Sequence, residues 1–337
     1  MKAAVLYGRE DVRVEDFTSR PLSTGEVRVQ IEASLTCGTD LKVFKRGYHQ
    51  KMIVPPAVFG HEFSGTILET GPGVSGWSPG ERVVAANSAP CGHCLYCRGN
   101  QENLCDDLLF VNGAYAESII LPGRLVENNL LRLRASTPFR DAALTEPLAC
   151  VVQGVQDCGL RSGMRVLVIG AGPIGLMFVV LATHLGCQVT VSGRGSNRLD
   201  KARALGAAHV SDATASEKQP QPGGFDIVIE AVGKPETWES AVRFVRKGGT
   251  VNFFGGCPAG TSISLDTALI HYSNLTLLAS FHHTPVTIRR ALELIESGAV
   301  RASDFIDGEC GLSELPTLFK SMASGNRAVK TLVDVRG

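Results

Sequence analysis

The sequence predicts an α/β protein of two domains, one rich in short β-strands and one built on a doubly wound parallel sheet. Three observations support this prediction. The chain has 337 residues, a length typical of two domains. Residues 1–147 contain short β-branched runs bounded by Gly, Pro and Ser, such as EVRVQIEAS. From about residue 150, continuous apolar strands alternate with helices, which indicates a parallel sheet covered on both faces.

Local patterns place the elements within the two halves. Strands of the first half are predicted over 2–7, 26–34, 63–71 and 82–86. Strands of the second half are predicted over 165–170, 188–193, 225–233, 250–256 and 271–281. Helices are predicted over 173–186, 197–207, 235–249 and 287–299, followed by a last strand over 329–335.

The charge balance excludes several classes of partner. Lys and Arg together number 33, as do Asp and Glu, and a neutral chain gives no support for nucleic acid or an acidic membrane surface as partner. The apolar stretches VLVIG and LMFVVLATHLG are too short to span a membrane. The N-terminal MKAAVLYGREDVRVEDF lacks the apolar run of a secretory signal, so we expect a cytoplasmic protein without membrane association.

Four of the ten cysteines lie within fifteen residues, in CGHCLYCRGNQENLC. The four are Cys91, Cys94, Cys97 and Cys105, and their spacing supplies four thiolates from one loop. Two disulfides are the alternative, but C-x2-C spacing is poor for disulfide geometry and a cytoplasmic chain keeps its thiols reduced. Four thiolates close a tetrahedral zinc shell, so the pattern predicts a structural zinc site with no open position for substrate.

A glycine motif follows the first strand of the second half. Gly170, Gly172 and Gly175 form G-x-G-x-x-G in VIGAGPIGLMF, with Pro173 and Ile174 between them. The motif ends a predicted strand and begins a predicted helix, which is the context required for dinucleotide binding. The glycines allow a tight turn, approach of the backbone to a pyrophosphate and close packing of helix on strand.

The second strand of that half indicates which dinucleotide is bound. Folds that prefer NAD place an acid about 20 residues after the glycine motif, where it binds the ribose hydroxyls. Gly193 occupies that position here, and it is followed by Arg194 and, one helical turn later, Arg198. A missing carboxylate and a nearby guanidinium favour a 2′-phosphate, so the sequence predicts NADP rather than NAD.

Three dispersed motifs, TCGTD (36–40), GHE (60–62) and TEPLAC (145–150), together offer thiolate, imidazole and carboxylate groups. A catalytic zinc takes three protein ligands and keeps one open position. Such an ion acts as a Lewis acid on an alcohol oxygen. Each motif is weak alone, because Asp40, His61 or Glu62 is also compatible with an ordinary polar role.

With these motifs in order, the chain resembles the zinc-dependent medium-chain dehydrogenase/reductase family, on its sorbitol, threonine and polyol dehydrogenase-like branch. The resemblance extends over essentially the whole chain, from CGTD and GHEFSG through GERV and the four cysteines to EPLA and GAGPIG. It implies a GroES-like catalytic domain over 1–148 and 282–337, with a structural-zinc lobe at 91–105. A Rossmann dinucleotide-binding domain over 149–281 completes the fold.

The resemblance also implies roles for individual residues. Cys37 and His61 match catalytic-zinc ligands, and Glu62 matches the glutamate that binds zinc in sorbitol dehydrogenase-like members. Glu146 matches a second glutamate, which either binds the zinc or lies directly behind its ligands. Thr39 matches the hydroxyl that relays the substrate proton. The implied protein is an NAD(P)-dependent enzyme with two zinc ions per chain, acting on a polyol, sugar alcohol or related secondary alcohol, or on the ketone in reverse.

Several alternatives stay open at the level of sequence. The third catalytic ligand is Glu62, Glu146 or Cys150, with the glutamates favoured. A threonine-type dehydrogenase is disfavoured because no histidine stands near Lys42. A zinc-free reductase would lack the cysteine lobe, and a non-catalytic dinucleotide-binding regulator would not need Cys37, His61 and Glu62 together. The predicted strand 271–281 has an exposed edge, and with the resemblance it predicts a homodimer or homotetramer.

Overall fold

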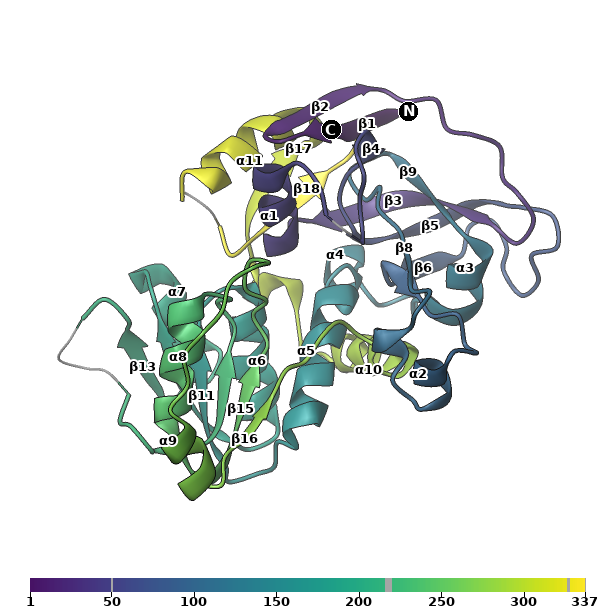
Figure 1. The fold of residues 1–337 in the computed structure, drawn as a ribbon. Coiled ribbons are helices and arrows are strands. Elements are labelled where there is room, and N and C mark those ends of the chain that lie inside the picture. Colours follow the sequence, from purple (N-terminus) through teal and green to yellow (C-terminus); the bar gives the residue numbers. More distant parts are fainter. Residues whose placement is uncertain (50, 216–219, 326–327, 337) are drawn as a thin grey trace. The chain divides into compact units, whose positions relative to one another are not determined.

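The structure, a computed structural model, describes residues 1–49, 51–215, 220–325 and 328–336 (Figure 1). These residues form two compact units. Unit 1 joins Met1–Ala149 to His283–Gly337, and unit 2 is Cys150–His282. Both boundaries lie one residue from those expected from the sequence. Among the described helices, none is long and apolar enough to cross a membrane.

Unit 1 is rich in short strands, as the turn-bounded runs of its sequence predict. Its three sheets have the strand orders β2-β1-β4, β10-β6-β5-β3-β18-β17 with β9 beside β3, and β7-β8. The strands are β1 (Lys2–Gly8), β2 (Asp11–Asp16), β3 (Val27–Leu35), β4 (Ala57–Val58), β5 (Glu62–Thr70), β6 (Arg82–Ala85), β7 (Ser88–Ala89), β8 (Leu109–Phe110), β9 (Ser118–Leu121), β10 (Leu130–Arg132), β17 (Ile306–Gly311) and β18 (Lys330–Asp334).

The two chain segments of unit 1 meet in its largest sheet, which contains β17 and β18. The helices are α1 (Gly38–Arg46), α2 (Leu95–Arg98), α3 (Gly123–Asn129), α4 (Phe139–Ala142), α10 (Pro285–Glu296) and α11 (Leu315–Ala323), with short 3-10 turns at Glu102–Leu104, Ala302–Asp304 and Leu312–Glu314. Strand β18 pairs with β3, where Leu332 lies opposite Leu35, so the last strand borders the strand that leads to Cys37.

An aromatic cluster forms the core beside this junction. Phe44 of α1 stacks on Phe319 of α11 with ring centroids 5.4 Å apart. Phe59 and Tyr115 pack edge to face at 5.7 Å, and both lie against Phe319. Each of these four side chains is at most 1% exposed. Such close packing restrains the backbone on either side of residue 60.

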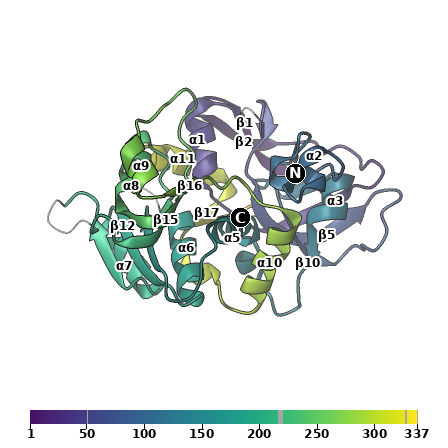
Figure 2. The ribbon, with the colours of Figure 1, turned by 60° about the horizontal axis from the view of Figure 1, so that its bottom comes forward.

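Unit 2 contains a six-stranded parallel sheet of order β13-β12-β11-β14-β15-β16 (Figures 1 and 2). Its strands are β11 (Arg165–Ile169), β12 (Gln188–Gly193), β13 (His209–Asp212), β14 (Phe225–Glu230), β15 (Val245–Phe253) and β16 (Thr276–Leu278). Its helices are α5 (Thr145–Cys158), which begins in unit 1, α6 (Pro173–His184), α7 (Ser196–Ala204), α8 (Pro235–Phe244) and α9 (Thr267–Tyr272). The central strands β11 and β14 bury mainly Val, Ile, Leu and Phe side chains, as expected of a parallel sheet covered on both faces.

Two expected elements differ from the structure. The strand predicted over 271–281 is restricted to Thr276–Leu278, because Asp266 caps helix α9 through the backbone N–H of Leu269 and Tyr272 ends that helix. The helix predicted over 235–249 ends at Phe244. Strand β15 then begins at the β-branched Val245, and residues 246–249 form a bulge that the left-handed Gly248 (φ 70°) permits.

Candidate functional site

Cys37 is the N-cap residue of helix α1, and its sulfur takes part in the cap. Its Sγ accepts a hydrogen bond from the backbone N–H of Thr39 at 3.4 Å. Asp40 reciprocates, since its Oδ2 accepts from the backbone N–H of Cys37 at 3.1 Å, and the two residues form a capping box. The predicted relay residue Thr39 is half-buried in the same first turn.

His61 and Glu62 enter the site at the beginning of strand β5. The register pairs Leu35 of β3 with Glu62, which brings the GHE motif beside the residues that precede Cys37. His61 Nδ1 lies 3.0 Å from Asp40 Oδ1. Burial alone lowers the pKa of His61, but the Asp40 carboxylate and the Cys37 thiol raise that pKa well above its usual value. Nδ1 is thus paired with Asp40, and the Cys37 side chain is the second hydrogen-bond partner of the ring.

The side chains of Cys37, His61 and Glu62 converge. One ligand atom from each lies within 4.8 Å of the other two. Glu62 is fully buried, and its Oε2 accepts a hydrogen bond from Lys330 Nζ, which also donates to Thr36 O at 3.0 Å. Its other oxygen, Oε1, is buried and has no hydrogen-bond partner among the described residues. A sulfur, an imidazole nitrogen and an unsatisfied carboxylate oxygen match the donor set of zinc.

Glu146, in the first turn of α5, is a further buried carboxyl group of unit 1. Burial raises the pKa of Glu146 to about 7, although nearby His61 opposes this shift. His283 Nε2 lies 3.9 Å from Glu146 Oε1 and 3.1 Å from Asn87 Oδ1. Glu146 is thus close enough to feel the charges of His61 and Glu62 but is not one of the three converging groups. Cys150 is the first residue of unit 2.

The four lobe cysteines are also brought together by the structure. Their sulfur atoms all lie within 4.8 Å of one another, and Cys94 Sγ is 3.5 Å from Cys97 Sγ. None of the ten cysteines, all of which the structure describes, forms a disulfide. The backbone N–H of Cys97 lies 3.5 Å from Cys94 Sγ, and backbone donors of this kind lower the pKa of Cys94 to about 6. His93 points elsewhere, with Nδ1 2.9 Å from Cys91 O.

Backbone geometry and close packing explain the glycines of the motif in unit 2. Gly170 adopts φ 114° directly after β11, and Gly172 is the N-cap of α6, with Pro173 in its first turn. A Cβ on Gly175 would lie 1.8 Å from Gly170 O, so only glycine fits there. Ile174 is half-buried between the glycines. This strand, turn and helix match the geometry that binds a pyrophosphate at a helix N-terminus.

Gly193 ends β12 against this turn. A Cβ on Gly193 would lie 2.7 Å from Ala171 Cβ and 3.1 Å from Ala171 N, so the Ala171 methyl group occupies the space of a side chain at 193. Arg194 is exposed, and Arg198 is half-buried in α7. The absence of an acid at 193 therefore has a steric reason, which the sequence pattern alone did not reveal.

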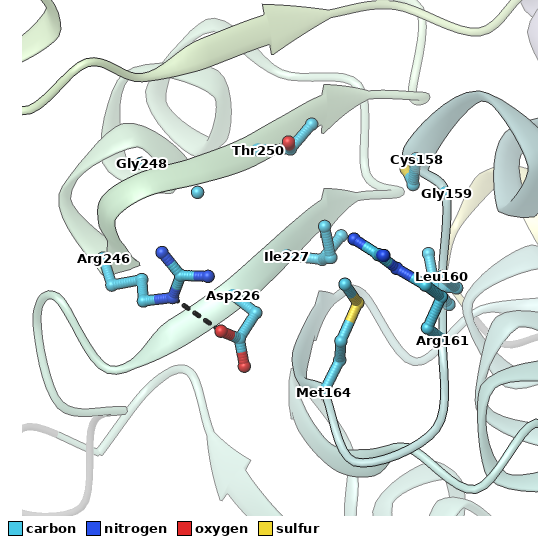
Figure 3. A pocket seen from close by; sticks show the side chains of 11 residues that line it. Cys158, Gly159, Leu160, Arg161, Met164, Asp226, Ile227, Arg246, Gly248 and Thr250 are labelled. Atoms are coloured by element: carbon cyan, nitrogen blue, oxygen red, sulfur yellow. Dashed lines mark hydrogen bonds and ion pairs between the residues drawn. The ribbon is translucent and has the colours of Figure 1, made fainter.

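Unit 2 has a cavity of about 370 Å³ that is lined by none of the predicted site residues. Figure 3 shows the side chains that line it. It lies at the starts of β11, β14 and β15, where Asp226 Oδ1 accepts a hydrogen bond from Arg246 Nε at 2.6 Å. The glycine motif instead follows the carboxyl end of β11, which is the edge at which parallel sheets bind their ligands. We therefore do not assign the cofactor to this cavity.

Sequence reasoning missed residues that support the site. Lys330 pairs with Glu62, Tyr115 donates to Asp40, and His283 lies beside Glu146. All three are buried. Lys330 stands in the apolar run VKTLVDV, and a lysine inside such a buried strand is the one local signal that indicates an internal charge partner.

Comparison with known proteins adds independent findings. The model described as "Alcohol dehydrogenase GroES-like domain" matches residues 23–129, and "Zinc-binding dehydrogenase" matches residues 173–297. D-altritol 5-dehydrogenase of Agrobacterium fabrum is 33% identical over 319 residues, which cover 92% of each chain. L-threonine 3-dehydrogenase of Pyrococcus abyssi is 30% identical over 96% of this chain and 95% of its own. A structure from Sinorhizobium meliloti 1021, assigned to the zinc-binding dehydrogenases and bound to NADP, has a TM-score of 0.89 at 30% identity and 98% coverage of both chains.

Proposed function

The chain belongs to the zinc-dependent medium-chain dehydrogenase/reductase family, on its polyol and threonine dehydrogenase-like branch, and on that premise we propose that Cys37, His61 and Glu62 hold its catalytic zinc. The protein is an NAD(P)-dependent oxidoreductase that transfers a hydride between a secondary alcohol and the nicotinamide. The substrate we propose is a polyol or sugar alcohol, since relatives include sorbitol and D-altritol dehydrogenases. A second, structural zinc belongs to Cys91, Cys94, Cys97 and Cys105.

One observation supports the catalytic assignment most strongly. Three potential ligand atoms lie within 4.8 Å of one another, and Glu62 Oε1 is buried without a hydrogen-bond partner among the described residues. An unsatisfied buried carboxylate oxygen is costly, and a cation at this point would remove the cost. When bound, zinc supplies Lewis acidity toward the alcohol oxygen.

The residues of the chain then have distinct tasks. Asp40 fixes the ring of His61, and Lys330 fixes one oxygen of Glu62, so both proposed ligands are oriented before metal arrives. Thr39, in the first turn of α1, takes up the proton of the substrate hydroxyl and passes it toward solvent. Glu146 serves as the buried carboxyl behind the ligands rather than as the third ligand.

Metal analysis of paired variants tests this division of roles. We expect about two zinc ions per wild-type chain. Glu62→Gln should lose the catalytic ion and keep the lobe ion, whereas Glu146→Gln should keep both. A Glu146→Gln protein with one zinc, beside a Glu62→Gln protein with two, would reverse the assignment. One zinc per wild-type chain would favour a non-catalytic dinucleotide-binding regulator instead. A turnover screen of polyols, aminocyclitols and simple secondary alcohols with NAD and NADP identifies the substrate.

NADP is the preferred cofactor in this proposal, since Arg194 can pair with a 2′-phosphate where no acid at 193 repels it. The Ala171 methyl group also prevents an acid from being introduced at 193 without a clash. Arg194→Ala should lower the NADP preference by about tenfold, because a charge-assisted bond contributes roughly 1.5–3 kcal/mol and exposure weakens it. Ala171→Gly combined with Gly193→Asp and Arg194→Ala should reverse the preference. Equal use of NAD by the wild type would contradict the proposal.

The proposal also includes the oligomeric state of the protein and its cellular compartment. Strand β16 lies at one end of the parallel sheet, and Tyr272 and Phe281 nearby are 80% and 50% exposed. An unpaired edge beside exposed aromatic groups supports pairing between copies of the chain in a homodimer or homotetramer. Light scattering at working concentration checks this, and a monomer would contradict it. Ten cysteines that form no disulfide among the described residues support a reducing, cytoplasmic compartment.

A further inference from the structure

Tyr115 is a fully buried tyrosine of unit 1 whose hydroxyl group contacts a support of the proposed zinc site. The hydroxyl donates to Asp40 Oδ2 at 2.5 Å and lies 3.2 Å from Leu35 O. The other oxygen of the same carboxylate, Oδ1, lies 3.0 Å from His61 Nδ1. Tyr115, Asp40 and His61 therefore form a continuous hydrogen-bonded row that leads from the core of unit 1 to a proposed ligand.

The Asp40 carboxylate links two proposed ligands at once. Besides His61 and Tyr115, it accepts a hydrogen bond from the backbone N–H of Cys37 at 3.1 Å. The residue is only 1% exposed, so water does not substitute for a lost donor. Three donors hold the plane of this carboxylate, and any rotation of that plane would move the ring of His61. Of the three donors, only the tyrosine hydroxyl belongs neither to a proposed ligand residue nor to the helix cap.

The position of the hydroxyl is itself fixed by packing. The ring of Tyr115 lies so close to Gly60 that a Cβ there would be 2.7 Å from it, and Gly60 directly precedes His61. The backbone N–H of Tyr115 donates to Phe59 O at 2.9 Å. Phe59 and Phe319 contact the ring edge to face, with centroids 5.7 and 6.1 Å away. Packing thus fixes the position of the Tyr115 ring and the direction of its hydroxyl group.

We propose that Tyr115 is a positioning residue of the zinc site, which holds Asp40 so that His61 keeps Nδ1 on the carboxylate and presents Nε2 to the metal. The inference rests on the proposed function, because it takes His61 as a ligand. Tyr115 touches neither metal nor substrate in this role. Its contribution is to the affinity of the site for zinc, through the orientation of one imidazole ring.

Tyr115→Phe removes only the hydroxyl group and tests the proposal. We expect its catalytic zinc to bind about tenfold or more weakly in competition with a chelator, since outer partners of metal ligands typically contribute 10- to 100-fold. The lobe zinc of the same molecules should be retained, and circular dichroism should show the wild-type fold. Tyr7→Phe is the matched control: it removes a tyrosine hydroxyl that bonds the half-buried Glu15 at 2.7 Å in the same unit, and zinc affinity should not change.

A double-mutant cycle separates positioning from general stability. In an Asp40→Asn background, Tyr115→Phe should change zinc affinity by less than about twofold, because the residue acts through that carboxylate. A Tyr115→Phe protein that melts at a lower temperature but binds zinc as tightly as the wild type would overturn the proposal and leave only a structural role. His61→Ala in the same assay tests the proposed function separately: full zinc content in that variant would refute the ligand assignment, whatever the result for Tyr115→Phe.

Discussion

The lobe of residues 91–105 and the cluster of Cys37, His61 and Glu62 are both candidate zinc sites, and they are assembled in opposite ways. The lobe takes all its thiols from one loop and stabilises them with its own backbone N–H groups. Two of its cysteines are half-exposed. The cluster takes its three side chains from the starts of α1 and β5, and the lysine that supports it comes from β18. His61 is buried, and so are the charged residues Asp40 and Lys330 that pair with the cluster.

This difference determines what each site demands of the fold. A local site needs only a short loop, so distant substitutions leave it intact. A buried site of charged groups needs each charge to be matched, as Glu62 is by Lys330 and His61 is by Asp40. An unmatched charge in such a place costs several kcal/mol. This contrast would be refuted if the lobe depended on distant residues, or if the buried cluster did not depend on them.

Removal of a proposed ligand should have the largest effect. Cys37→Ser is expected to lower turnover by about a thousandfold or more, because the loss of a Lewis acid removes several kcal/mol of transition-state stabilisation. The fold and the lobe zinc should remain. Steady-state kinetics, circular dichroism and metal content measure the three quantities, and near-full activity would refute the proposed mechanism.

The second-largest effect is expected on stability, when the buried ammonium group of Lys330 is removed. In Lys330→Met, Glu62 loses its partner, and the free energy of unfolding of the metal-free protein should fall by about 3–5 kcal/mol. Burial lowers the pKa of Lys330 while Glu62 raises it, and the net shift is upward, so the native protein keeps this lysine charged. The double variant Lys330→Met with Glu62→Gln should recover most of the loss in urea unfolding. Equal destabilisation of the single and double variants would show that the charge is not the cause.

Disruption of the lobe should leave chemistry nearly unchanged. Cys97→Ser is expected to release the lobe zinc and lower the melting temperature or disturb assembly, while turnover per intact subunit falls by less than about tenfold, because four thiolates leave no site for substrate. Cys310→Ser is the control, a thiol of the same unit outside both clusters, and should leave zinc content at the wild-type value. A stable, correctly assembled but inactive Cys97→Ser protein would contradict the structural role.

The smallest effect concerns pH, and it belongs to the buried site. Burial raises the pKa of Glu146 from its usual 4.5 to about 7 in the native, metal-free protein. The unfolded chain releases this proton near pH 4.5 and the native chain near pH 7, so the native state loses stability as pH rises through that range. Glu146→Gln should flatten this dependence by on the order of 1–3 kcal/mol. Urea midpoints of both metal-free proteins across the range measure it, and parallel curves would exclude Glu146 as the cause.

The same contrast explains how far the sequence could predict the structure. The α/β class and the family were confirmed by the two family models and the fold. The cysteine spacing and the glycine motif are local, so they identify their candidate residues directly. Asp40, Tyr115 and Lys330 meet only after the sheets of unit 1 form, and no spacing in the sequence links residues 40, 115 and 330. The strand expected over 271–281 failed for a local reason, because the Asp266 cap commits Tyr272 to helix α9.

The place of β18 in the sheet of unit 1 has a consequence for biosynthesis. Ribosomes add about 5–20 residues per second, so Lys330 is made roughly ten to forty-five seconds after Cys105. The lobe is complete as a sequence of four cysteines long before β18 exists to border β3 and supply the counter-ion of Glu62. On a nascent chain, we expect the lobe to capture its metal before β18 is made and the buried cluster to do so only after Lys330 has left the ribosome. The direction of synthesis thus sets the order in which the two sites mature.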